Sequence, residues 1–398
     1  MLNPFYTSTS DAELKRRQDL ILSVMEENQV DAAVMYNSGD MIGGPLKWAS
    51  DYSHYYSMAG IICKECLAIF RSGNECKFDE DRPLVPKGDR LPERIWSCPY
   101  VHGATFNSER FGEAMAYFIQ THNFKRIGWL GLNYISASVY KYLTEHLTDV
   151  EFVDLMPKLD EVRLVKSPEE MKGYLESVDL HDRLVQYCTA TIRPRLTIRE
   201  LNLEIMAQAS LLGAIEFNTS LIRGWRGERA LGIDEQFEPG DYCYILIEVA
   251  AKAGEWAECS RLFRLGMEPE EKWVKIADKL AEIQHKVAEK CVPGAVAEDI
   301  FEYCKQLQVE AGFYPELRMC IHGQGVDIVD LPIFTNGDKT VLQEGMFIAI
   351  HPAWQNCAEG WDAPYLSYTD NFIVEKDGAK RCLWARQAQI CSIRKHRN

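Results

Sequence analysis

The sequence predicts an α+β protein of two domains: an α/β layer domain, then a domain in which helix pairs frame a curved antiparallel sheet. Strand-like and helix-like runs alternate over roughly the first 150 residues, which is typical of an α/β layer. Two long helical segments follow, and the last third consists of short apolar strands separated by Gly-rich turns. Because the pattern changes between Asp154 and Lys166, we expect domains at 1–159 and 160–398.

The composition is that of an ordinary globular protein, with 46% hydrophobic and 26% charged residues. A net charge of -15 argues against nucleic acid or an anionic membrane as a partner. No apolar run reaches the ~18 residues of a membrane-spanning helix, and the N-terminus lacks the features of a signal peptide. The thirteen cysteines therefore indicate reduced thiols in a cytoplasm rather than disulfides. We expect a cytoplasmic protein that acts on a small molecule.

The first domain opens with a predicted helix, because apolar residues recur at helical spacing from Asp11 to Asn28. Short apolar runs then predict strands, and longer amphipathic runs predict two more helices. We expect strands at 31–36, 60–63, 66–70 and 127–131, and helices at 108–122 and 136–147.

The second domain opens with strong helix starts. Ser167 can cap a helix whose first turn holds Pro168 and two glutamates, and Thr197 with Glu200 forms a capping-box pattern. A turn at Glu238–Asp241 then enters a predicted β-hairpin. We expect helices at 168–192, 197–212, 269–291 and 297–311, and strands at 242–250, 255–265, around 322, 346–351, 368–374 and 379–383.

Four polar residues of this domain lie on or beside short apolar runs: Glu248, Glu258, His322 and His351. Burying a charge without a partner is costly, so a shared site descended from a metal site is the simplest explanation. The structural alternatives are a hydrogen-bonded core histidine for His322 and an ion pair with Arg261 for Glu258. For Glu248 the alternative is a structural acid with a raised pKa.

These segments resemble the pita-bread family, which includes methionine aminopeptidase, prolidase, aminopeptidase P and creatinase. The N-terminal domain is similar to that of the two-domain branch: prolidase, aminopeptidase P and creatinase. The resemblance therefore implies a pita-bread catalytic domain after a smaller creatinase-like domain. Its markers are Arg163–Met171, Glu238–Asp241, Arg261, His322–Gly325, Glu344–Met346 and His351 with Pro352.

The resemblance also implies a ligand set. Peptidases of the family hold two metal ions with Asp, Asp, His, Glu and Glu, and the matching positions here are Glu248, Glu258, His322, His351 and Thr369. Two neighbouring divalent ions need bridging carboxylates. Thr369 is a neutral hydroxyl, so we do not expect a two-metal centre. Glu258, His322 and His351 can hold a single Fe, Mn or Zn ion; the alternative is a creatinase-like site without metal.

Aromatic and basic residues near these segments are candidates for substrate binding. Several tryptophans can contribute to an aromatic box for a cationic group, with core or rim packing as the alternative: Trp225, Trp256, Trp354 and Trp361. Arg223 and Arg226 can form a fork for a substrate carboxylate, and a solvated basic loop is the alternative.

In creatinase and in the DMSP lyases of this family, the partner subunit's N-terminal domain contributes to substrate binding. The resemblance therefore implies a homodimer in which the N-terminal domain of one subunit lies near the active site of the other. The corresponding residues here are His54, Tyr55 and Tyr56.

The altered ligand set predicts a creatinase-like hydrolase that cleaves a C–N bond of a small zwitterion with a cationic head and a carboxylate. His322 or His351 would carry the proton, and Glu258 and Glu248 would hold the cation or polarise water. Three alternatives stay open: a lyase of the DMSP-lyase type with a single metal, an Xaa-Pro peptidase, and a catalytically inactive binding protein on a peptidase scaffold.

Overall fold

The computed structural model describes residues 9–38, 43–51, 57–73, 94–99, 108–218, 222–227, 229–251, 254–355, 365–382 and 390–393. The chain divides into two compact units, Met1–Arg163 and Leu164–Asn398. The boundary expected after residue 159 lies four residues before this division. In the described part of the chain, no helix is both long and apolar enough to cross a membrane.

The N-terminal unit contains a six-stranded sheet in the order β4-β3-β2-β1-β5-β6. Its strands are β1 (Ala32–Asn37), β2 (Met58–Cys63), β3 (Leu67–Gly73), β4 (Arg94–Pro99), β5 (Arg126–Trp129) and β6 (Glu151–Asp154). The sheet is mixed, because β1 pairs in parallel with β5 and antiparallel with β2. Every residue of β1 and β2 is buried, as expected for central strands of an α/β layer.

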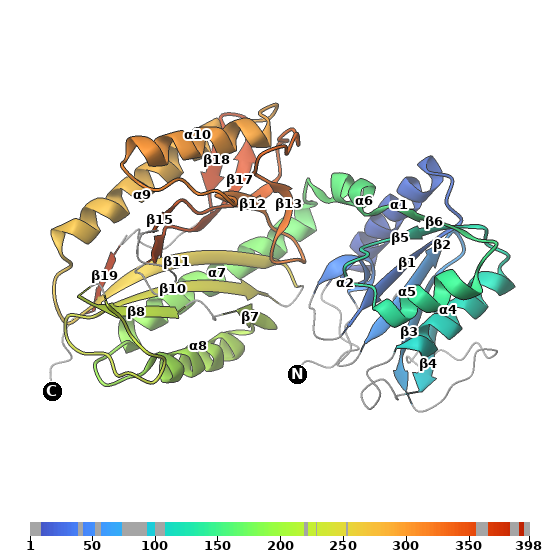
Figure 1. Cartoon of the computed structure of the whole chain (residues 1–398), viewed down its shortest axis with the longest axis horizontal. Coiled ribbons are helices and arrows are strands. Elements are labelled where there is room, and N and C mark those ends of the chain that lie inside the picture. The colour runs from blue at the N-terminus through green and yellow to red at the C-terminus, as the bar shows by residue number, and fades with distance from the viewer. Residues whose placement is uncertain are drawn as a thin grey trace. The chain divides into compact units, whose positions relative to one another are not determined.

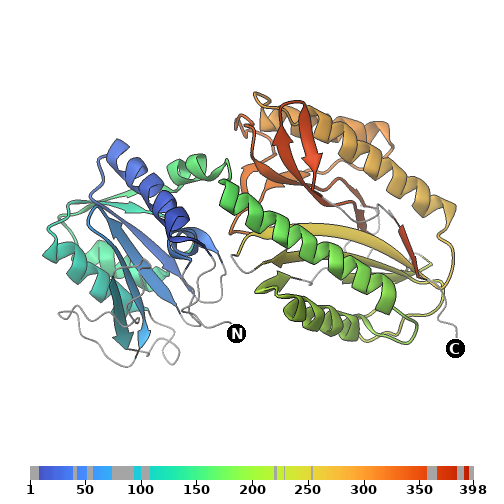
Figure 2. The ribbon, with the colours of Figure 1, turned by 180° about the vertical axis from the view of Figure 1, so that it is seen from behind.

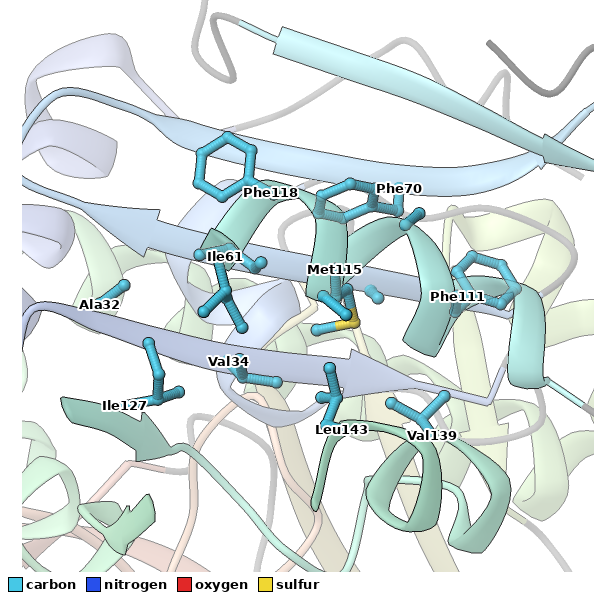
Figure 3. Packing of buried hydrophobic residues seen from close by; sticks show 14 of the residues in the cluster. Ala32, Val34, Ile61, Phe70, Phe111, Met115, Phe118, Ile127, Val139 and Leu143 are labelled. Carbon is cyan, nitrogen blue, oxygen red and sulfur yellow. The ribbon is translucent and has the colours of Figure 1, made fainter. Parts of the chain in front are cut away.

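The helices in the described part of this unit are α1 (Asp11–Glu27), α2 (Gly44–Ser50), α4 (Glu109–Thr121), α5 (Ala137–His146) and α6 (Met156–Arg163). Figure 3 shows α4 and α5 packed against the sheet, with Phe118 and Met115 of α4 above Val34 and Ile61. The sequence predicted α1, α4 and α5 but not α2. All residues of α2 are buried, so it has no polar face to produce an amphipathic pattern.

The C-terminal unit contains four long helices: α7 (Pro168–Thr191), α8 (Ile198–Leu212), α9 (Glu271–Lys290) and α10 (Ala297–Glu310). Both expected capping boxes form. The Ser167 hydroxyl accepts from the Glu170 amide, and the Glu170 carboxylate accepts from the Ser167 amide. Thr197 and Glu200 make the same exchange at the start of α8.

The strands of this unit form two five-stranded paths, in which the antiparallel pairing expected from the sequence holds for every pair except β11 with β19. One has the order β19-β11-β10-β8-β9 with β7 beside β10, and the other has the order β13-β12-β14-β17-β18. Strand β19 pairs in parallel with β11, so the first sheet is mixed. The two sheets meet at β11 and β17, where the Ser260 amide donates to the Thr369 carbonyl at 3.2 Å. The bounds are β7 (Glu216–Asn218), β8 (Ile222–Arg226), β9 (Arg229–Ala230), β10 (Tyr242–Ala250), β11 (Trp256–Leu265), β12 (Ile321–Gly323), β13 (Asp330–Ile333), β14 (Phe347–Ile350), β17 (Asp370–Glu375), β18 (Gly378–Arg381) and β19 (Ile390–Ile393), with β15 (Ala353–Gln355) and β16 (Tyr365–Ser367) as a separate pair.

Helices α7 and α8 cover one face of the β8-β10-β11 sheet, and α9 and α10 lie against the other sheet (Figures 1 and 2). Side chains alternate between the two faces of a strand. Cys243, Ile245 and Ile247 of β10 therefore pack into the core beneath α7 and α8. Glu248 lies on the opposite face, directly across from Glu258 of β11. The strand alternation thus places both acids on the face away from α7 and α8.

Candidate metal and substrate site

Glu258, His322 and His351 converge in the C-terminal unit. One ligand atom from each lies within 4.8 Å of the others, and all three side chains are buried. Glu258 is on β11 and His322 is on β12, while His351 directly follows β14. Antiparallel pairing of β12 with β14 sets Ile321 opposite Ile350, which brings the segments of the two histidines together.

The His322 ring is oriented by its own backbone. Its Nδ1 lies 2.8 Å from the Gly323 carbonyl oxygen, and because a carbonyl only accepts, Nδ1 carries the hydrogen. In the neutral ring, Nε2 then has a free lone pair, and it lies 3.6 Å from Glu258 Oε1. The His351 ring lies beside it, with centroids 5.1 Å apart. A histidine that donates from one ring nitrogen and offers the other is typical of metal ligands.

Glu248 completes the group on the β10 side. Its Oε2 accepts a 2.6 Å hydrogen bond from Asn218 Nδ2. Burial and the neighbouring charge of Glu258 raise the pKa of Glu248 to about 8. Burial has the same tendency at Glu258, but the charge and hydrogen bond of His322 prevail, so the pKa of Glu258 is lowered. At neutral pH the metal-free pair therefore holds one proton, on Glu248.

The two histidines differ in charge. Burial and the charge of His322 lower the pKa of His351 to about 4, so His351 is neutral at physiological pH. Burial also disfavours charge on His322, but the carboxylate of Glu258 outweighs it and raises the pKa of His322. His351 thus offers a neutral imidazole, while His322 forms an ion pair with Glu258 when protonated.

This donor set fits one divalent ion. Two imidazoles and a carboxylate, buried and within reach of one another, are a common ligand set for a single Fe, Mn or Zn.

Thr369 has no carboxylate that could bridge a second ion, and the side chains that contact its hydroxyl are also hydroxyls. The Thr369 hydroxyl accepts from Ser260 Oγ at 2.9 Å and lies 3.2 Å from Ser367 Oγ. Tyr244 adds a fourth hydroxyl, 2.5 Å from Ser367 Oγ. These neutral groups satisfy one another's hydrogen bonds, and none of them is a carboxylate.

Arg261 does not pair with Glu258, the alternative that the sequence left open. The two side chains point to opposite faces of β11 because they are three residues apart. Arg261 Nη2 instead donates to Asp370 Oδ1 at 2.7 Å.

The two candidate arginines of β8 have different surroundings. Arg226 donates twice to Asp241, from Nε at 2.7 Å and from Nη2 at 2.6 Å. It therefore fixes the turn before β10, and we remove it from the substrate site. Arg223 lies opposite Tyr244, on the sheet face that carries the acids. Its guanidinium lies 5.3 Å from the centre of the Tyr365 ring and has no acidic partner in the described ranges.

The candidate tryptophans are also separated. Trp256 is buried on the same strand face as Glu258. Trp354 packs edge-to-face on Trp273, with ring centroids 5.2 Å apart, as part of an aromatic core cluster. Trp225 belongs to the same cluster, and the described residues form no aromatic box around either ring. Trp361, His54, Tyr55 and Tyr56 fall outside the described residues, so their substrate roles and the homodimer remain predictions.

Sequence reasoning missed three amide side chains that support the acids. Asn218 holds Glu248, and Asn371 Oδ1 accepts from the Glu258 backbone amide at 2.9 Å. Asn371 Nδ2 in turn donates to Gln324 Oε1. The available signal was position, because Gln324 and Asn371 each follow a family ligand position by two residues and so share its strand face.

Comparison with known proteins identifies the family. The model of metallopeptidase family M24 matches residues 172–379, which is just over half of the 398-residue chain and contains all the candidate ligands. The chain belongs to metallopeptidase family M24. The family resemblance expected from the sequence is therefore confirmed.

Among curated proteins, this M24 chain is 25% identical over 237 residues to an Xaa-Pro dipeptidase of Pyrococcus horikoshii, covering 58% of this chain and 66% of that protein. The chain thus spans just under two thirds of that relative's length.

Among solved structures, the M24 chain resembles the prolidase of P. horikoshii, with a TM-score of 0.73, 20% identity and coverage of 94% of this chain and 100% of that one. It also resembles an X-Pro aminopeptidase of Thermotoga maritima, with a TM-score of 0.76, 14% identity and coverage of 94% and 99%. These likenesses confirm the pita-bread fold.

Proposed function

We propose that this M24 protein hydrolyses an amide bond in short peptides of the Xaa-Pro kind, with a single divalent ion held by Glu258, His322 and His351. The convergence of these three buried ligand atoms within 4.8 Å carries the proposal. The relatives named Xaa-Pro dipeptidase support a peptide substrate better than the small zwitterion expected from the sequence.

A bound divalent ion would supply a Lewis acid that polarises the scissile carbonyl and lowers the pKa of the attacking water. The protein contributes the orientation of the ligands. The Gly323 carbonyl fixes the His322 ring, and Asn371 fixes the strand position of Glu258. Glu248, held by Asn218, carries a proton near neutral pH and can exchange it with the reacting groups.

The substrate carboxylate has a candidate anchor in Arg223. An Xaa-Pro dipeptide ends in a carboxylate, and a guanidinium can bind it with two parallel hydrogen bonds. Arg223 lies on the sheet face of the acids and is held against the Tyr365 ring. We therefore place the C-terminal end of the substrate at Arg223.

The proposal is tested with the full-length protein purified without a metal-binding tag. Elemental analysis should find one ion per chain. Treatment with a chelator should abolish hydrolysis of Gly-Pro and Ala-Pro, and one equivalent of Mn, Zn or Fe should restore it. His351→Ala should lose both the ion and the activity. Two ions per chain, or no ion under any loading condition, would contradict the single-metal site.

A metal-free, creatinase-like hydrolysis is the second candidate. It is favoured by the 3.6 Å approach of His322 Nε2 to Glu258 Oε1, which can serve as an acid–base pair without an ion. Hydrolysis of guanidino or betaine-type substrates by chelator-treated protein, lost in His322→Ala, would establish this reaction. Inactivity of the chelator-treated protein on these compounds would exclude it.

A further inference from the structure

Two buried N–H groups beside the proposed metal site have no acceptor among the described residues: Trp256 Nε1 and Gln324 Nε2. Both side chains are almost fully buried, Gln324 at 0% exposure and Trp256 at 3%. A buried donor without an acceptor costs about 1–3 kcal/mol, so such groups in a folded protein indicate a missing partner.

The orientation of the Gln324 amide follows from its neighbours. The Glu258 backbone amide can only donate, so Asn371 must present Oδ1 to it. Asn371 Nδ2 then donates, and Gln324 must present Oε1. This order leaves Gln324 Nε2 as the free end, a donor with no described acceptor.

The two residues that carry these donors lie at the same end of the site. The Trp256 backbone amide donates to the carbonyl of Gly325, the residue after Gln324, at 2.9 Å. Trp256 also shares the face of β11 with Glu258, two residues along the strand. Arg223 lies toward the opposite end, because its partner Tyr244 is opposite Leu262, four residues beyond Glu258. Along the strand, Glu258 thus separates the donor pair from the carboxylate anchor.

We propose that Trp256 Nε1 and Gln324 Nε2 bind an oxygen atom on the N-terminal side of the substrate, so that the preferred substrate is an N-acylated Xaa-Pro unit rather than a free dipeptide. This rests on the proposed function, which puts the substrate carboxylate at Arg223 and the scissile bond at Glu258. The substrate then extends toward Trp256. An acyl carbonyl there accepts from both N–H groups, whereas a free ammonium only donates and leaves both unsatisfied.

The test compares N-acetyl-Gly-Pro with Gly-Pro by titration calorimetry on the metal-free full-length protein and by hydrolysis after metal loading. We expect the acetylated ligand to bind about tenfold more tightly, the value of one or two net hydrogen bonds. Equal affinity, or tighter binding of the free dipeptide, would overturn the donor pair. Binding of neither ligand would instead contradict the proposed function.

Two substitutions isolate the donors. Gln324→Glu keeps the oxygen that accepts from Asn371 and replaces the free NH₂ with an acceptor, so preference should shift toward the free ammonium of Gly-Pro. Trp256→Phe should weaken the binding of N-acetyl-Gly-Pro severalfold and so reduce the preference for it over Gly-Pro. Trp225→Phe is the matched control, because Trp225 Nε1 also lacks a described acceptor but its ring stacks on Tyr242, away from Glu258. If Trp225→Phe loses as much affinity for N-acetyl-Gly-Pro as Trp256→Phe, the loss comes from altered packing and not from the missing donor.

Discussion

At the residue scale, the carboxyl group of Glu248 lies across from that of Glu258 on neighbouring strands, and like charges in this position repel. Its pKa of about 8 lies above the ordinary 4.5, so the folded state binds a proton that the unfolded state releases. The stability from this proton is fully present below about pH 4.5 and is lost as pH rises through about 8.

Glu248→Gln should therefore make the stability of the folded protein depend less on pH. In chelator-treated protein, the melting temperature of the wild type should fall from pH 5 to pH 8.5 more steeply than that of the variant. Thermal denaturation at several pH values measures this difference. Glu268→Gln, at an exposed acid, should follow the wild type. Parallel curves for wild type and Glu248→Gln would show that Glu248 is ionised throughout.

The two arginines of β8 give a matched pair of substitutions. Arg226→Gln should lower the free energy of unfolding by about 1–2 kcal/mol, because buried Asp241 loses its charged partner, and should leave KM unchanged. Arg223→Gln should leave stability unchanged and raise KM for Xaa-Pro substrates about tenfold. Urea denaturation and steady-state kinetics measure the two effects. If both variants lose the same stability and show the same rise in KM, the assignment of stability to Arg226 and substrate binding to Arg223 is wrong.

The residues that sequence reasoning could locate are those whose chemistry conflicts with their surroundings. Glu258, His322 and His351 stand out as polar groups in apolar strands. The role of Arg226 could not be predicted. Its partner Asp241 lies 15 residues away along the chain, and the sequence around Arg226 does not distinguish it from an arginine exposed to solvent. Gln324 was also missed, because its position two residues after His322 gives a sequence signal but does not reveal the contact to Asn371.

At the element scale, the Ser167 cap is the clearest stability determinant of α7. Ser167→Ala removes the hydroxyl that accepts from the Glu170 amide and should lower the free energy of unfolding by about 1 kcal/mol. Chemical denaturation measures the change. Ser210→Ala in α8 is the control, because that exposed hydroxyl only bonds back to the Met206 carbonyl and its loss should be neutral. Equal effects would show that the cap adds nothing to stability.

Helix starts could be predicted because caps carry local signatures: α7 and α8 begin within one residue of the expected position. The pairing of the strands, and their division between two sheets, could not be predicted. The parallel pairing of β19 with β11 joins residues more than 120 positions apart, and no local pattern reports it. The same holds for the division into two sheets, which depends on where β17 meets β11.

At the scale of the whole molecule, the C-terminal unit contains every candidate ligand and its own hydrophobic cores. A fragment of residues 164–398 should therefore fold cooperatively and bind one metal ion with the affinity of the full chain. Circular dichroism on heating and metal titration would measure this. A fragment that aggregates, or that binds no ion when the full chain does, would show that the N-terminal unit is required.

Fold and family could be predicted from the order of several weak motifs, which together specify one scaffold. The reaction could not be predicted in the same way. Replacing family carboxylates with His351 and Thr369 is compatible with one ion or with none, and the relatives favour peptide hydrolysis over the creatinase-like reaction expected first.

The separation of the ligands along the chain has a kinetic consequence. Glu258, His322 and His351 are 64 and 29 residues apart, so an unfolded chain would have to close two long loops before one ion could touch all three. The entropy lost in closing these loops makes it unfavourable for the unfolded chain to bind the ion before it folds. A bound ion should therefore slow unfolding and leave the refolding rate almost unchanged, so that the metal-loaded protein stays folded for longer.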